Sequence, residues 1–253
     1  MKIYCSYNSE LHEFLNKVVI LILDKYGSQL NLDTLEEIEL INKEKISYET
    51  DGKVLSKSKI IVTSRLYELL PTYEIEDLNN NDDYIMLRKT LYHEMGHIND
   101  MVFMPKLYNH VLESFESRNV DADSISSLFW IEYVAEKRTA VFENVYNMEI
   151  CDELVKRKWH CTIIDPYAHF GENNFFYLTK LLPYFIARTK SEEIRKQYIN
   201  QIKNRLLVQY IHEIEDELKF LETKGVFDDV MALKKLYAII NKYYNEFVIK
   251  YKR

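Results

Sequence analysis

The stretch from Leu91 to Asp100 reads LYHEMGHIND and contains an H-E-x-x-H pattern formed by His93, Glu94 and His97. In a helix, residues at positions i and i+4 lie on the same face, about one turn apart. Two imidazoles at this spacing can bind one zinc ion, and the intervening glutamate can reach a water at the metal. The pattern therefore predicts a helix that carries a hydrolytic site with Zn2+ as its cofactor.

The residues around this pattern fit one helix from about Asp83 to Phe103. The run at 79–83, NNNDD, supplies side chains that cap a helix N-terminus, and Pro105 marks the end of the helix. The two histidines fall beside the main apolar stripe, so we expect them to face a cleft while the stripe enters the core. The expected core positions are Leu87, Leu91, Ile98 and Val102.

A catalytic zinc site needs at least one more protein ligand and an open position for water. A second helix, expected at about 126–150, contains the segment IEYVAEKRTA. Along one of its faces acids alternate with small residues, which lets another helix approach closely. We therefore expect Glu132 to be the third metal ligand. Glu136, one turn further on, can accept a hydrogen bond from the ring N–H of a ligand histidine that does not face the metal. We expect this histidine to be His93.

The pair of motifs, H-E-x-G-H at 93–97 and E-x-x-A-E at 132–136, resembles the signature of the gluzincin class of zinc metallopeptidases. Within that class it is similar to the lethal-factor-type bacterial toxin peptidases and the related proline-specific secreted peptidases. It is also similar to the repressor-cleaving metallopeptidases of phages and their hosts. The resemblance covers about residues 83–145 and implies hydrolysis of peptide bonds.

The resemblance also implies a role for each residue of the two motifs. The implied residues are the zinc ligands His93, His97 and Glu132, the catalytic base Glu94, and Glu136 in support of a ligand. A peptide substrate is further implied to lie along an edge strand before the motif helix, and the segment at 59–66, KIIVTSRL, is the candidate for that strand. We therefore expect an endopeptidase that acts on an extended peptide, in preference to an exopeptidase.

One element of the toxin-type pattern is missing from this sequence. Those peptidases use a Tyr shortly before the third-ligand Glu to steady the oxyanion, but the segment at 121–131, DADSISSLFWI, contains no Tyr. The electrophilic group has to come from elsewhere. The loop expected at 156–174 offers Tyr167 and His169 as catalytic candidates, with His160 beside them.

The patterning predicts an α+β protein that is mostly helical and zincin-like. Segments rich in β-branched residues place a small sheet near residues 33–66, and Asp51-Gly52 is the expected hairpin turn. Few glycines and prolines, 5 and 4 in the chain, favour helices elsewhere.

Helical periodicity predicts a first helix at 10–26 and two long C-terminal helices at 192–223 and 228–251. We expect a zincin-like catalytic region at 1–175. The helical C-terminal region at 176–253 is expected to pack on it as one unit.

Charge and composition exclude other classes of protein. The chain of 253 residues has a net charge of −7 and no long basic run, which argues against nucleic-acid binding. The N-terminal segment MKIYCSYNSELHEF has no signal-peptide core, and the apolar run at 14–23 is too short for a membrane span. We therefore expect a soluble cytoplasmic protein whose partner is a peptide or protein substrate and which binds no membrane.

Two other functions compete with the peptidase. A catalytically idle zincin-like protein would keep the site and serve as a binding or scaffold protein, but the intact Glu94 counts against an idle site. A non-peptidase zinc hydrolase such as a deformylase takes a Cys ligand from a Gly-rich strand. Cys5 lies in IYCSYN, which contains no glycine, so the peptidase remains the favoured prediction.

Overall fold

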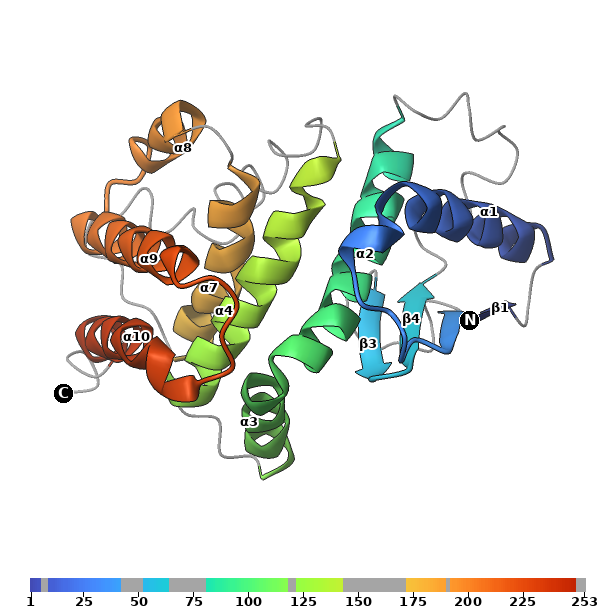
Figure 1. Cartoon of the computed structure of the whole chain (residues 1–253). Coiled ribbons are helices and arrows are strands. Elements are labelled where there is room, and N and C mark those ends of the chain that lie inside the picture. Colours follow the sequence, from blue (N-terminus) through green and yellow to red (C-terminus); the bar gives the residue numbers. More distant parts are fainter. Residues whose placement is uncertain are drawn as a thin grey trace. The chain divides into compact units, whose positions relative to one another are not determined.

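A computed structural model of the chain describes residues 1–5, 9–41, 52–63, 81–117, 122–142, 172–189 and 192–248 (Figure 1). The backbone groups into two compact units. The first comprises Met1–Val102 and Arg138–Tyr146, and the second comprises Phe103–Lys137 and Asn147–Arg253. The expected division at residue 175 between a catalytic and a C-terminal region stays a prediction.

The first unit contains a four-stranded sheet in the order β1-β2-β4-β3. Its strands are β1 (Lys2–Cys5), β2 (Glu37–Ile41), β3 (Gly52–Ser56) and β4 (Lys59–Thr63). β1, β2 and β4 are parallel, whereas β3 runs antiparallel to β4. The sheet extends beyond the predicted region because β1, with only four residues, is too short to show a strand periodicity in the sequence.

The hairpin turn between β3 and β4 lies at 57–58, so its prediction at Asp51-Gly52 is wrong. The backbone N–H of Ser58 donates to the Oγ of Ser56 at 3.2 Å and supports the turn. Gly52 instead begins β3. Its lack of a side chain lets β3 pack closely against Thr90 and Glu94 of α2.

One face of the sheet forms the core of the first unit. Ile38, Leu40, Ile60 and Val62 alternate along β2 and β4 and are fully buried. They share one apolar cluster with residues of α1 (Ser9–Tyr26) and of α2 (Asp82–Phe103). The first helix is thus confirmed, and a 3-10 turn at Gly27–Gln29 (η1) follows it.

α2 begins and ends close to its predicted limits. The Oδ1 of Asn81 accepts a hydrogen bond from the backbone N–H of Tyr84 at 3.0 Å and so caps the helix N-terminus. α3 (Pro105–Glu116) follows after one residue, and its proline occupies the first helical position, where the missing N–H costs nothing. Val102 was expected in the core but is 37% exposed, because it lies in the last turn of α2.

The described part of the second unit is helical. Besides α3, the helices are α4 (Ala122–Arg138), α7 (Glu172–Arg188), α8 (Glu192–Ile199), α9 (Arg205–Thr223) and α10 (Lys234–Phe247), with a 3-10 turn at Val230–Leu233 (η7). The 3-10 turn that follows α4, Thr139–Val141 (η5), belongs to the first unit. Aromatic rings join α7, α9 and α10. Phe175 stacks on Tyr210 with ring centroids 5.7 Å apart, and Tyr210 in turn lies 4.7 Å from Tyr243.

The long helix expected at 192–223 is in fact two helices, α8 and α9. Asn204 has an extended backbone, and its Oδ1 accepts a hydrogen bond from the N–H of Leu207 at 3.0 Å. This is an N-cap, which starts a new helix. The break does not interrupt the apolar periodicity, because Ile202 and Leu207 on either side of it are both buried.

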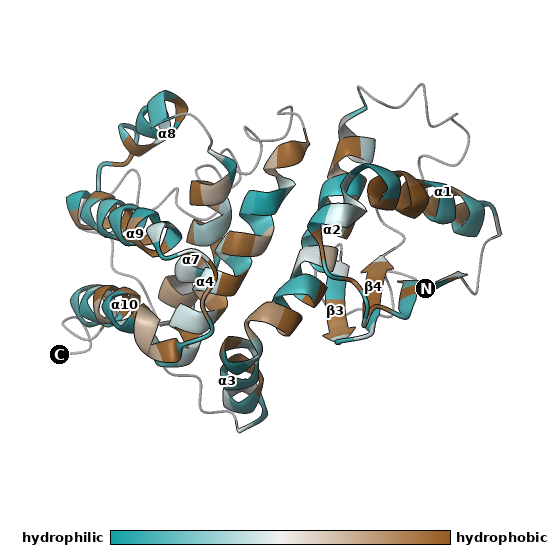
Figure 2. Cartoon of the chain, in the orientation of Figure 1, coloured by the Kyte–Doolittle hydropathy of each residue, from teal (hydrophilic) through white to brown (hydrophobic). Residues whose placement is uncertain are grey.

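The architecture is therefore mostly helical with a small four-stranded sheet, as predicted for the fold class. Figure 2 shows hydrophilic as well as hydrophobic residues on each of α1, α9 and α10, as expected for helices that bury one face. Within the described residues, no helix combines the length and the apolar character that crossing a membrane requires.

Replacing Asn204 by Ala tests the break between α8 and α9. The variant loses the hydrogen bond to Leu207, so we expect the free energy of unfolding to fall by about 1 kcal/mol in urea titrations. Asn204→Ser keeps a capping oxygen and should stay close to wild type. Equal losses in the two variants would show that the volume of the side chain matters and the cap does not.

Candidate metal site

The segment of α2 that carries the sequence motif is buried along its whole length. Every residue from Leu91 to Asp100 is buried, and His93, Glu94 and His97 each expose only 7% of their surface. Burial of polar or charged side chains is costly unless each one has a partner. A helix whose only role was to pack in the core would carry apolar residues at these positions. The burial of these polar side chains therefore indicates a functional role.

The two histidines of α2 bring the same ring nitrogen to one place. Their Nε2 atoms lie 2.9 Å apart, and the rings meet edge to face with centroids 4.6 Å apart. Two imidazole nitrogens on one tetrahedral zinc ion stand roughly 3.3 Å apart, given Zn–N distances of about 2.0–2.1 Å. The spacing of His93 and His97 is therefore close to what a shared metal ion requires.

Among the described residues, His93 and His97 form with Glu132 a group that could hold a metal ion. His93 and His97 belong to the first unit and Glu132 to the second, and each side chain offers one ligand atom. Two imidazoles and a carboxylate are donors that zinc accepts, and a three-ligand set leaves a position for water. These are the three residues predicted from the sequence. The group is compatible with a metal ion, and the identity of that ion stays a prediction.

Both acids of the E-x-x-A-E motif are bound by side chains of α7. The hydroxyl of Tyr184 donates to Oε2 of Glu132, and Nε of Arg188 donates to Oε1 of Glu136. Tyr184 and Arg188 were not predicted as site residues, although their spacing of four residues matches that of the two acids. Glu136 is thus held by an ion pair, and its predicted contact with His93 stays a prediction.

A buried ion pair follows the second histidine on α2. Asp100, 1% exposed, accepts hydrogen bonds from both terminal nitrogens of Arg138, with Nη1 and Oδ2 2.6 Å apart. Arg138 also donates to the carbonyl of Gly96 at 3.3 Å. Asn99 donates to Asp100 at 3.0 Å and accepts from the N–H of Asn31 at 2.8 Å. Asp100 therefore neutralises an arginine at the end of α4.

The predicted general base, Glu94, lies against the first residue of β3. A Cβ added to Gly52 would stand 2.9 Å from Cγ2 of Thr90, 3.0 Å from Cγ of Glu94 and 3.1 Å from its Oε1. Contacts this short would force the side chain of Thr90 or Glu94 to move, so glycine lets β3 approach α2 without that displacement. β3 thus passes directly beside the carboxylate of Glu94.

The strand expected at 59–66 was assigned the role of a substrate-binding edge, and this assignment is wrong for β4. β4 pairs with β2 on one side and with β3 on the other, so it lies inside the sheet. Among the described strands, β3 and β1 are the edges. β3 runs antiparallel to its neighbour, a direction that the sequence pattern of single strands does not reveal.

The two candidates for the electrophilic group, Tyr167 and His169, lie outside the described residues, as does His160. Their catalytic role stays a prediction.

No protein-family model matches the chain, and searches of curated proteins and of solved structures give no match either. The function therefore has to be inferred from the side chains of this chain.

Replacing Gly52 by Ala tests the contact between β3 and Glu94. The added methyl group overpacks the space beside Thr90, so we expect a loss of about 1–3 kcal/mol in the free energy of unfolding. Gly27→Ala is the matched control, because its added Cβ would meet only atoms of Leu23, at 3.6 Å. Urea unfolding measures both variants.

Thr90→Ser in the Gly52→Ala background removes Cγ2, the nearest of the contacted atoms. We expect the double variant to recover part of the lost stability. If Gly52→Ala and Gly27→Ala were equally stable, β3 would not lie as close to α2 as described.

Proposed function

We propose that this chain is a zinc-dependent metallopeptidase of the gluzincin type, with a zincin-like catalytic region, that acts as an endopeptidase. The observation that carries the proposal is the group formed by His93, His97 and Glu132, with Glu94 on the same helix as the two histidines. A chance H-E-x-x-H on a surface helix would have no reason to be buried. The donor set supports zinc, and three protein ligands are typical of catalytic zinc sites.

Each residue of the group has a role in the proposed hydrolysis. His93, His97 and Glu132 would hold zinc, which when bound lowers the pKa of a water to about 7 and polarises a carbonyl. Glu94 accepts the proton of the attacking water and delivers it to the amine nitrogen that leaves. Because Glu94 is 7% exposed, bulk water has little access to its carboxylate.

The edge of β3 supports an extended peptide as substrate. In the described part of the sheet β3 pairs with β4 alone, so its other edge can accept a further strand. Gly52 at the start of β3 lies against Glu94, and a peptide added to this strand would run past the general base. Tyr167 and His169 remain the proposed donors to the developing oxyanion.

Metal analysis and peptide hydrolysis test the proposal together. The purified wild-type protein should carry about one zinc ion per chain. His93→Ala and Glu132→Ala should purify with little metal, since each removes one of three ligands and leaves only a weak residual zinc affinity. Glu94→Gln should keep the metal but cleave a peptide library about 10²- to 10⁴-fold more slowly, because only the general base is lost.

His212→Ala is the control for loss of a histidine, because the side chain of His212 is 51% exposed on α9. It should change neither zinc content nor cleavage. A wild-type protein without zinc would overturn the proposal. Equal cleavage by wild type and Glu94→Gln would exclude Glu94 as the base, and zinc binding without cleavage of any peptide would favour the idle binding protein.

A further inference from the structure

α7 presents two side chains to α4 at a matching interval. Tyr184 and Arg188 are four residues apart, as are their partners Glu132 and Glu136. Residues at i and i+4 share a helix face, so each helix contributes one pair to a single contact. These four residues are called the α4–α7 polar cluster. The hydroxyl of Tyr184 binds Glu132, the proposed metal ligand, whereas the positive charge of Arg188 pairs with Glu136.

The ion pair of the α4–α7 polar cluster is shielded from solvent. The side chains of Arg188 and Glu136 are 11% and 2% exposed. The guanidinium carbon of Arg188 also lies 5.5 Å from the centroid of the Tyr184 ring, a cation–π contact. Removing one partner of a buried pair leaves an uncompensated charge, which is strongly unfavourable. Arg188 is therefore fixed by Glu136 and in turn restrains the ring of Tyr184.

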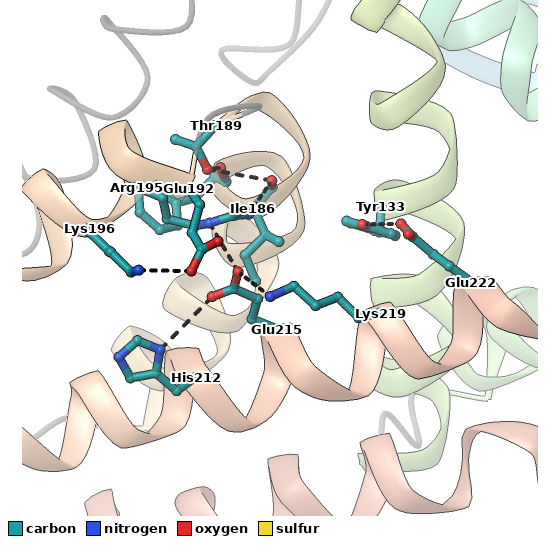
Figure 3. A network of polar contacts seen from close by, with 11 residues as sticks. Tyr133, Ile186, Thr189, Glu192, Arg195, Lys196, His212, Glu215, Lys219 and Glu222 are labelled. Carbon is teal, nitrogen blue, oxygen red and sulfur yellow. Dashed lines mark hydrogen bonds and ion pairs between the residues drawn. The ribbon is translucent and has the colours of Figure 1, made fainter.

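A second polar network anchors the C-terminal end of α7 (Figure 3). Nη1 of Arg195 donates to the carbonyl of Ile186 at 3.1 Å, and Nε of Arg195 lies 3.2 Å from Oε1 of Glu215. The hydroxyl of Thr189 donates to the carbonyl of Phe185 at 2.7 Å. These contacts hold the turn of α7 on which the polar cluster depends.

The hydrogen bond from Tyr184 orients Glu132. It is donated to Oε2 of the carboxylate and so restrains the rotation of the Glu132 side chain. A carboxylate that is held in this way loses less conformational freedom when the metal binds, which raises affinity. Partners that lie behind a metal ligand typically change the affinity of the site by about 10- to 100-fold.

We propose that Tyr184 is a positioning residue that sets the metal affinity of Glu132, and that the Arg188–Glu136 ion pair holds Tyr184 in place. The inference rests on the proposed function, because it requires Glu132 to be a ligand. According to this proposal, residues of α7 also determine how tightly the metal is bound, although α7 lies far along the chain from the motif helix.

Tyr184→Phe tests this role, because it removes only the hydroxyl. We expect the zinc affinity, measured by competition with a chromophoric chelator, to fall about 10- to 100-fold. Tyr133→Phe is the matched control. Tyr133 lies on α4 beside Glu132, and its hydroxyl also donates to a glutamate, Glu222 (Figure 3). The control should bind zinc as wild type does. Thermal unfolding of the metal-free proteins checks that both variants fold.

A positioning role further requires that Tyr184 act through Glu132. In the Glu132→Ala background, Tyr184→Phe should therefore leave the residual zinc affinity unchanged, whereas a general structural effect would lower it again. Arg188→Gln should weaken zinc binding, and Arg188→Lys should restore part of the loss because the ion pair with Glu136 is kept.

The outcomes separate this inference from the proposed function. If wild type binds zinc and Tyr184→Phe binds it equally well, the positioning role is wrong and the metallopeptidase proposal stands. A further fall of affinity on adding Tyr184→Phe to Glu132→Ala would also overturn the positioning role. If wild type binds no zinc, both proposals fail together.

Discussion

The burial of α2 over residues 91–100 is the constraint on which the rest of the structure depends. A helix segment that is buried along its length cannot leave polar side chains to water, so surrounding elements must supply partners. The carboxylate of Asp100 is neutralised by Arg138, and Asn99 is bound by the backbone of Asn31. β3 adapts to the same helix by having a glycine where it meets Glu94. The sheet, the loop after α1 and the end of α4 are thus arranged around one buried polar segment.

The sequence predicted best what is determined within one helix. The H-E-x-x-H motif requires only the helical repeat to bring His93 and His97 together, and the structure places their Nε2 atoms 2.9 Å apart. The limits of α2 were also predictable, because Asn81 and Pro105 act on the backbone next to them. The division at Asn204 could not be read from periodicity, since apolar positions continue across it and the cap depends on one side-chain hydrogen bond.

Contacts between distant segments were the part that the sequence did not reveal. Tyr184 lies 52 residues after Glu132, and no local pattern indicates that the two side chains meet. The order of the strands was equally hidden, because pairing depends on register and direction, which single strands of four or five residues do not encode. The proposed edge strand was assigned to β4 for this reason, although the segment that passes Glu94 is β3.

Pro183 has a mechanical consequence for α7. It lies inside the helix, directly before Tyr184, and it has no N–H to donate to the carbonyl of Thr179 one turn earlier. α7 therefore bends most easily immediately before the turn that contacts Glu132 and Glu136 of α4. A tilt of that turn would move the hydroxyl of Tyr184 and, with it, the carboxylate of Glu132. A displacement of the C-terminal end of α7 would therefore be transmitted through Tyr184 to the half-buried carboxylate of Glu132.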